Sequence, residues 1–216
     1  MKIVARGIKG PFSATIVSGN YPAGVPYLEV NRFTNGDVRF NCLIEAYLEH
    51  LRTATASKII GSEDYRPLKI NFERKSHVYE LRSGRYIGYV DSAVIDVAPT
   101  VAQVFALSPE KVKDLSVTVD CRMDQVNTEI SVVGLENTKY TPVVHVDVYD
   151  PEGAKIEPYS KNIVLDPESK SGIYAFEHAI NDTKGQWRIV VKDVLSGLTN
   201  EAAYELNPQA PRVSRQ

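Results

Sequence analysis

The sequence predicts an all-β protein made of two consecutive β-sandwich domains, the second of them immunoglobulin-like. Apolar and polar residues alternate along most segments, and short turn-forming sequences separate these segments. One polar stretch that contains a proline divides the segments into two groups, and 216 residues are enough for two cores of about 100 residues each. We therefore expect domains at 1–110 and 115–207, followed by a disordered tail at 208–216.

The first predicted hairpin joins Tyr27–Thr34 to a strand that starts at Val38. Asn35-Gly36-Asp37 lies between them, and an Asn-Gly pair tolerates the positive φ of a tight turn. Apolar residues at every second position from Val38 to Ala46 indicate a half-buried strand. The segment Leu43–Ser57 also fits a helical stripe, which leaves a helix as the alternative. We favour a strand that ends near Tyr47 and a polar loop after it.

Two further hairpins are predicted in the first domain, because Gly and Pro turns separate short alternating segments there. They join His77–Arg82 to Tyr86–Val90 through Ser83-Gly84-Arg85, and Ala93–Val97 to Val101–Leu107 through Ala98-Pro99-Thr100.

The segment Ser108–Asp114 is short, polar and charged, and its Pro109 cannot join a strand ladder, so it is the predicted linker. Six alternating segments follow: Leu115–Cys121, Glu129–Gly134, Pro142–Tyr149, Gly172–His178, Trp187–Asp193 and Ala202–Leu206. Their even spacing around one tryptophan is typical of an immunoglobulin-like sandwich, without the cysteine pair of antibody domains. We expect Trp187 to anchor this core, with Val144, Val146 and Val148 opposite it.

The charge pattern argues against nucleic-acid binding, because the net charge is −2 and no basic patch is visible. The longest apolar runs are far shorter than the roughly 20 residues of a membrane-spanning helix. The start MKIVARGIKGPF has no apolar region typical of a signal peptide, and the sequence does not indicate a cellular compartment. Cys42 and Cys121 fall in different predicted domains, so we expect two free thiols.

No residue pattern indicates a catalytic, cofactor or metal site. The four histidines are too far apart for a zinc site, and structural roles are expected for His145 and His178 on the polar faces of strands. Asp147, Asp150 and Glu152 surround a turn but lack the dense acidic pattern of a calcium loop. The sequence contains no GxSxG, GxGxxG or P-loop motif.

Tyrosines are the candidate binding residues, since the chain has twelve of them. Tyr79, Tyr86 and Tyr89 lie on adjacent predicted strands and could stack on sugar rings. The alternative is that they pack within the fold or at a domain interface, because aromatic residues suit both settings.

The segment from Glu29 to Leu107 resembles the C-terminal β-domain of bacterial β-galactosidase-like proteins related to glycoside hydrolase family 42. The matching positions are the strand His77–Arg82, the turn glycine Gly84, Tyr86–Gly88 and the strand end Ala106–Pro109. VYDPEG at Val148–Gly153 and GQWRIVVKDVLSG at Gly185–Gly197 resemble the immunoglobulin-like repeat that can follow this domain.

The resemblance implies a non-catalytic accessory module, because the family's catalytic barrel and its paired glutamates are not in this sequence. Its implied partner is the catalytic domain of a parent protein in cis. A carbohydrate-binding module that uses the surface tyrosines is the second hypothesis. An independent enzyme is the third, and it would need carboxyl groups with shifted pKa values in a deep pocket.

Overall fold

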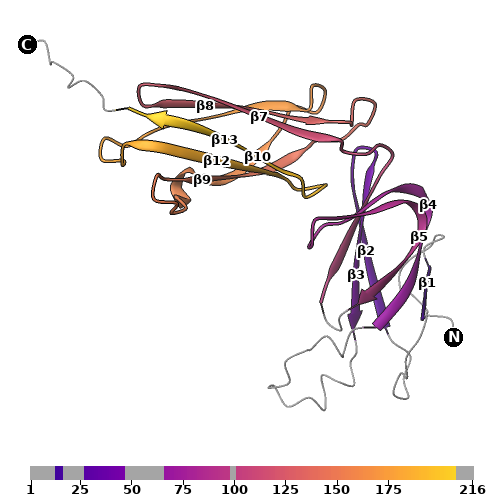
Figure 1. Cartoon of the computed structure of the whole chain (residues 1–216). Coiled ribbons are helices and arrows are strands. Elements are labelled where there is room, and N and C mark those ends of the chain that lie inside the picture. The colour runs from indigo at the N-terminus through magenta and orange to yellow at the C-terminus, as the bar shows by residue number, and fades with distance from the viewer. Residues whose placement is uncertain (1–12, 17–26, 47–65, 98–100, 208–216) are drawn as a thin grey trace, which may run out of the picture. The chain divides into compact units, whose positions relative to one another are not determined.

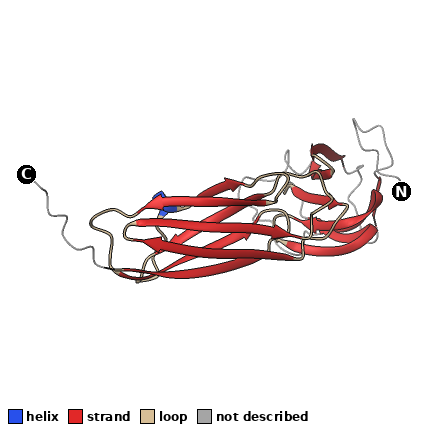
Figure 2. Cartoon of the chain, turned by 90° about the horizontal axis from the view of Figure 1, so that it is seen from above, coloured by secondary structure: helices blue, strands red, loops and turns tan. Residues whose placement is uncertain are grey.

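The computed structural model describes residues 13–16, 27–46, 66–97 and 101–207 (Figure 1). Strands dominate the described residues and the helical structure there is one short 3₁₀ turn, so the predicted all-β class is confirmed (Figure 2). The chain divides into two compact units, Met1–Pro109 and Glu110–Gln216. In the described part of the chain, no helix is long and apolar enough to cross a membrane.

The described residues of the first unit form a six-stranded antiparallel sheet in the order β1-β4-β6-β3-β2, with β5 paired to β4. Its strands are β1 (Ser13–Ile16), β2 (Tyr27–Asn35), β3 (Val38–Ala46), β4 (Arg66–Glu80), β5 (Arg85–Val97) and β6 (Gln103–Ser108).

The β2–β3 hairpin forms as predicted. Asn35 pairs with Val38, and Gly36 takes a φ of 58° in the two-residue turn, which its missing Cβ allows. The strand continues to Ala46, so the strand interpretation holds that far, and the predicted loop after it lies outside the described residues.

Strand β4 organises the unit, because it pairs with three other strands. Leu68 and its neighbours pair with β1, the last four residues pair with β6, and β5 follows β4 over almost its whole length. Two register irregularities, between Asn71 and Ser76 and between Val78 and Tyr79, interrupt the β4–β5 ladder. Bulges of this kind bend a strand and raise its twist, which lets one strand serve several neighbours.

The predicted hairpin of Ala93–Val97 with Val101–Leu107 is wrong. Residues Ala93–Val97 continue β5 and pair with the first half of β4. The second segment, β6, instead fills the space between β3 and β4. The alternation at Leu68, Ile70 and Phe72 is the signal for this first half of β4. The charged run from Glu73 to Lys75 hides its continuity with His77.

The core of the first unit comes from the inward residues of five strands. Strands β2 to β6 contribute Val30, Leu43, Leu68, Ile70, Phe72, Val78, Ile95, Val97, Phe105 and Leu107.

The second unit has seven strands in two antiparallel sheets, in the orders β10-β9-β12-β13 and β11-β8-β7 (Figure 1). The strands are β7 (Asp114–Arg122), β8 (Gln125–Val133), β9 (Val143–Tyr149), β10 (Lys161–Val164), β11 (Ser171–Glu177), β12 (Gly185–Asp193) and β13 (Thr199–Leu206). A 3₁₀ turn, η2 (Glu157–Tyr159), precedes β10. The six segments predicted as strands are therefore strands, and the four-residue β10 is the one that the sequence pattern did not indicate.

Trp187 is buried in this unit together with Ile189 and Val191 of the same strand. The valines of β9 are buried too, but they are not opposite these residues. Ile189 pairs with Val148 and Val191 with Val146 in the same sheet, so the expected facing arrangement is wrong. Buried residues of the three-stranded sheet face them instead, namely Leu115, Val126, Ile130, Val132 and Tyr174.

Part of the predicted linker is built into the second unit. The Glu110 carboxylate accepts hydrogen bonds from the backbone and side-chain amides of Asn137 and from the Thr138 hydroxyl. Val112 is buried, and the Lys113 amide donates to the Val133 carbonyl at 2.8 Å. These contacts extend the second unit upstream of Leu115.

Lys170 is a buried lysine whose ammonium group is surrounded by backbone carbonyls. Its Nζ donates to the carbonyl oxygens of Thr138 at 2.7 Å and Tyr140 at 2.9 Å, and also to that of Pro167. The residue has a φ of 56° and ends the turn before β11. Three carbonyl oxygens thus accept hydrogen bonds from the buried ammonium group.

Candidate functional site

An aromatic row crosses β4 and β5 in the first unit, and we define it as Tyr79, Tyr86, His77 and Tyr89. The ring centroids of Tyr79 and Tyr86 are 5.1 Å apart, and those of His77 and Tyr89 are 4.6 Å apart. Between these pairs, His77 Nδ1 lies 2.8 Å from the Tyr86 hydroxyl. All three tyrosines selected from the sequence therefore belong to one contiguous cluster.

The β-bulge explains why these residues share a face. Tyr79 pairs with Tyr86, and His77 pairs with Tyr89, although the two tyrosines of β5 are three residues apart. In a regular strand an odd spacing places side chains on opposite faces. The irregularity after Val78 leaves Ile87 as an extra, unpaired residue of β5, between Tyr86 and Gly88, so the alternation shifts by one residue there. Gly88, which pairs with Val78, has a φ of 147°. The sequence pattern alone did not show this register.

Exposure changes along the aromatic row. Tyr79 is 1% exposed and is a core residue, so it offers no ring to a sugar. Tyr86 is half-buried, and burial raises the pKa of its hydroxyl. Tyr89 is 49% exposed, but His77 and Lys75 both lie over its ring, with Lys75 Nζ 4.9 Å from the ring centroid. The exposed end of the row is thus an aromatic and cationic surface rather than a bare ring.

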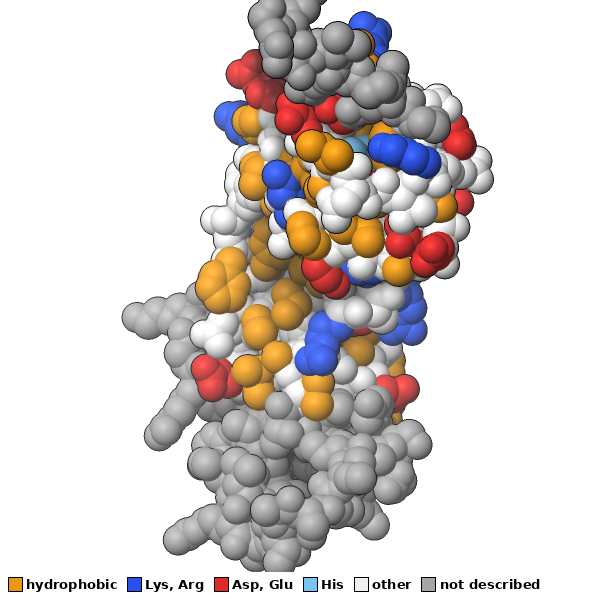
Figure 3. Space-filling view, turned by 90° about the vertical axis from the view of Figure 1, so that its left-hand side faces the viewer, with side chains coloured by type: hydrophobic (Ala, Val, Ile, Leu, Met, Phe, Trp, Pro, Cys, Tyr) orange, Lys and Arg blue, Asp and Glu red, His pale blue; other side chains and the backbone are white. Residues whose placement is uncertain are grey.

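Hydrophobic side chains gather on the described surface of the first unit, with Lys and Arg side chains near them (Figure 3). Besides Tyr89, the large exposed apolar side chains among the described residues of this unit are Phe33 and Val94.

The second unit holds a buried polar cluster that the sequence did not indicate. His178, expected on a polar face, is buried; its Nδ1 lies 2.7 Å from Asp182 Oδ2 and its Nε2 lies 2.8 Å from the Tyr204 hydroxyl. Tyr159 donates to the same carboxylate oxygen at 2.7 Å. Although burial opposes it, hydrogen bonds from Tyr159 and His178 lower the pKa of Asp182. Only the four-residue spacing of His178 and Asp182 could have been seen in the sequence.

This polar cluster is packed inside aromatic rings. The indole of Trp187 and the rings of Phe176 and Tyr159 contact His178. Burial raises the pKa of Tyr204, and the Trp187 indole N–H donates to the Thr183 carbonyl at 2.9 Å. Every polar group of the cluster has an internal partner, so its geometry is that of a structural network.

Hydrogen bonds lower the pKa of five described carboxyl groups. In Glu110, Asp147 and Asp182 burial opposes this effect and the hydrogen bonds outweigh it, whereas in Glu136 and Asp166 hydrogen bonds are the largest cause. Burial raises the pKa of Asp193, which is 0% exposed in the β12–β13 turn. There its Oδ2 accepts from the amide and hydroxyl of Ser196.

The outer face of the three-stranded sheet carries a shallow hollow of about 530 Å³ that includes Asp120 and Glu129. Asp120 accepts from Arg122 Nε at 2.8 Å, an exposed ion pair within one strand. Two carboxylates on an open polar sheet face lack the enclosure that glycoside cleavage needs.

The turn considered for calcium uses its oxygens internally. Asp147 contacts His145 and Lys155, whereas Asp150 Oδ1 accepts from the backbone amides of Glu152 and Ala154. Among the described residues, no group of three or more potential ligands is placed to hold a metal. Cys42 and Cys121 are free and half-buried.

Comparisons with known proteins give distant structural matches. The sequence matches no protein-family profile and no curated protein. A hypothetical protein from Pyrococcus horikoshii OT3 aligns over 44% of this chain and 89% of its own, with 16% identity and a TM-score of 0.30. A β-glucuronidase from Ruminococcus gnavus aligns over 80% of this chain, with 14% identity and a TM-score of 0.27. The chain spans 36% of that enzyme's length.

Proposed function

We propose that the chain is a non-catalytic accessory module of a carbohydrate-active protein, with an immunoglobulin-like second unit. The carbohydrate context rests on the resemblance of the Glu29–Leu107 segment to the accessory domain of β-galactosidase-like proteins. In this role the module packs in cis against a catalytic domain.

The placement of Asp193 carries the non-catalytic part of the proposal. A glycosidase needs a carboxylic acid with a raised pKa that touches the scissile bond, together with a second carboxylate about 5–9.5 Å away. Burial raises the pKa of Asp193, and this residue is enclosed in a hairpin turn with Ser196. Its proton cannot reach a bound glycoside.

The aromatic row supports contact with a protein domain. Interfaces are enriched in Tyr and Trp rings, which combine apolar area with a polar group, and Tyr89 offers such a ring at the surface. A carbohydrate-binding module is the second candidate because Tyr89 is half exposed, but the cation and imidazole over its ring compete with a stacked sugar.

A hydrolysis assay tests the non-catalytic role. The purified chain is incubated with a panel of aryl-glycosides, and we expect no turnover above a heat-treated sample. Turnover that one carboxylate substitution abolishes, for example Glu129→Gln but not Asp166→Asn, would show that the chain is an enzyme.

Retention on insoluble polysaccharides separates the two binding roles. We expect no retention of the wild-type chain. Retention that Tyr89→Ala removes and the exposed-site control Val94→Ala preserves would replace the accessory role with carbohydrate binding. Both substitutions change residues of β5 that are about half exposed.

A further inference from the structure

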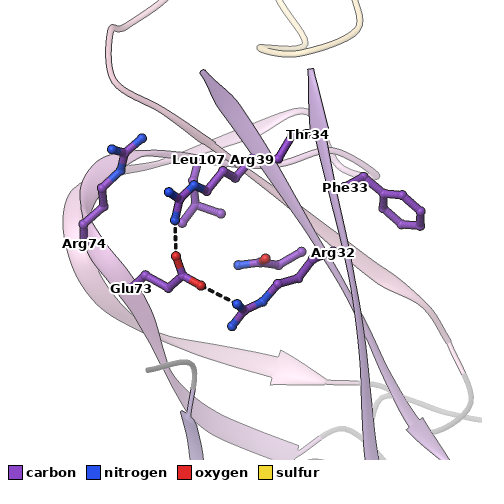
Figure 4. Close-up of a pocket in the computed structure, with 8 residues that line it drawn as sticks. Arg32, Phe33, Thr34, Arg39, Glu73, Arg74 and Leu107 are labelled. Carbon is purple, nitrogen blue, oxygen red and sulfur yellow. Dashed lines mark hydrogen bonds and ion pairs between the residues drawn. The ribbon is translucent and has the colours of Figure 1, made fainter. Parts of the chain in front are cut away.

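A hollow of about 260 Å³ opens in the first unit beside the β2–β3 hairpin (Figure 4). Residues from four strands line it, including Arg32, Arg39, Asn41, Glu73, Arg74 and Leu107. The hollow is separate from the aromatic row, whose residues are not part of its lining.

The strand register brings the charged side chains to one place. Arg32 pairs with Asn41 and Thr34 pairs with Arg39, so both arginines stand on the same face of the hairpin. Glu73 and Arg74 come from the irregular part of β4, between Asn71 and Ser76, where the alternation is broken. Two consecutive residues of β4 can therefore reach the same hollow.

Glu73 lies between two arginines and is bound by both. Its Oε1 pairs with Arg32 Nη1 and its Oε2 pairs with Arg39 Nη1, as the dashed lines in Figure 4 show. Phe33 points away from this group. Each guanidinium carries five N–H donors, and only one nitrogen of each is engaged by Glu73, so most donors of the pair are left for other acceptors.

The hollow has an excess of positive charge. Its lining contains three arginines and one glutamate, and Arg74 is exposed with no ion pair among the described residues. The Arg32 and Arg39 side chains are 31% and 43% exposed, so a solute can reach both guanidinium groups. Leu107 adds an apolar side chain to the lining.

Asn41 adds a neutral hydrogen-bonding group. The residue is 4% exposed and belongs to the lining of the hollow. A side-chain amide carries both N–H donors and a carbonyl acceptor, so Asn41 can hydrogen-bond to a solute there.

From these contacts we infer that the hollow binds the oxyanion group of a small ligand, a carboxylate or a phosphate. Arg39 and Arg74 supply charge and N–H donors, Arg32 supports them, and the Asn41 amide satisfies a further polar atom of the ligand. Glu73 orients the two hairpin arginines and limits the affinity, since its carboxylate already occupies part of the same donor set. Planar guanidinium groups suit carboxylate and phosphate oxygens because they bind in a bidentate manner. This site does not depend on the accessory role.

Titration of the full chain with three small solutes tests the site. Glucuronate, inorganic phosphate and uncharged glucose are added separately, and the arginine Nε–Hε signals are followed by NMR. We expect saturable shifts of the arginine signals with glucuronate, phosphate or both, and none with glucose. The responding solute identifies the ligand as a carboxylate or a phosphate.

Three variants make the titration decisive. Arg74→Gln should weaken binding about tenfold, because hydrogen bonds to charged groups contribute on that scale. Glu73→Gln should strengthen it, because the internal competitor for the guanidinium donors loses its charge. Arg188→Gln, which removes a comparably exposed arginine of the second unit, should leave it unchanged.

Several results would overturn the site. These are equal shifts with glucose, no saturable shift with either anion, weaker binding in Glu73→Gln, or equal weakening in Arg188→Gln and Arg74→Gln. Circular dichroism of each variant shows whether it is folded, and the gain expected for Glu73→Gln cannot come from unfolding.

Discussion

The imidazole of His178 meets the indole of Trp187 edge to face, with ring centroids 4.3 Å apart and an angle of 68° between the planes. His178 directly follows β11 of the three-stranded sheet, and Trp187 lies on β12 of the four-stranded sheet. This contact therefore joins the two sheets, and the polar cluster of His178 and Asp182 continues it towards the surface.

Replacing Trp187 by Ala should destabilise the second unit by about 3–5 kcal/mol, because the largest fully buried side chain would leave a cavity between the sheets. Urea unfolding followed by circular dichroism measures the change. Ile173→Ala, at a position that is 66% exposed on β11, should change the free energy of unfolding by less than about 0.5 kcal/mol. Equal effects of the two substitutions would contradict the central place of the indole.

Asp182 should make the second unit sensitive to acid. Its pKa is lowered in the folded state, so its contribution to stability is present above the unfolded value of about 3.9 and is lost as the pH falls through the lower folded value. In Asp182→Asn this part of the acid dependence should be missing. Unfolding curves between neutral pH and about pH 2 test it, and identical slopes for both proteins would disprove the assignment.

Asp193 should have the opposite pH dependence, because burial raises its pKa in the folded state. Its stabilising contribution is present below about pH 3.9 and is lost as the pH rises through the raised folded value. Relative to wild type, Asp193→Asn should therefore become more stable as the pH rises from acid to neutral. Asp166→Asn is the matched control, since backbone hydrogen bonds from Ser169 and Glu168 lower the pKa of that turn aspartate. As the pH rises from acid to neutral, the free energy of unfolding relative to wild type should therefore increase for Asp193→Asn and decrease for Asp166→Asn.

Gly134→Ala should destabilise the second unit by about 2 kcal/mol or more. A Cβ at this position would lie 2.3 Å from the Lys111 carbonyl oxygen, and the φ of 105° disfavours any side chain. Gly153 also has a positive φ, of 83°, but a Cβ added there would have no atom within 4 Å. Gly153→Ala therefore measures the cost of the backbone conformation without a steric clash. A smaller loss of stability at Gly134 than at Gly153 would show that the backbone near Lys111 moves away easily.

Strands and turns that depend on local alternation could be predicted from the sequence. Features that depend on the register between strands could not. The hairpin at Gly36 and the buried face of Trp187 follow from spacing and turn chemistry. The position of β6 between β3 and β4 could not be read, because pairing between distant strands leaves no local signal. The same holds for the aromatic row, whose common face results from a bulge after Val78.

The candidate sites differ in what the sequence could show. Tyr79, Tyr86 and Tyr89 were selected because of their number and position, yet only the structure separates the core residue from the exposed one. In the predicted hairpin Arg32 pairs with Asn41 and Arg39 with Thr34, so the common face of the two arginines was available from the hairpin register. Their partner Glu73 was not, because it comes from an irregular segment of a different strand.

The carbonyl cage around Lys170 gives the second unit a built-in reporter of its integrity. The three oxygens that accept from its Nζ also shield the amine from solution reagents. In the native protein an acylating label would react with exposed lysines such as Lys192 and leave Lys170 unmodified. Because Nζ is enclosed by these carbonyl groups, the label can reach it only when the turn before β11 opens. The rate of labelling at this one amine therefore measures how often that part of the sandwich comes apart.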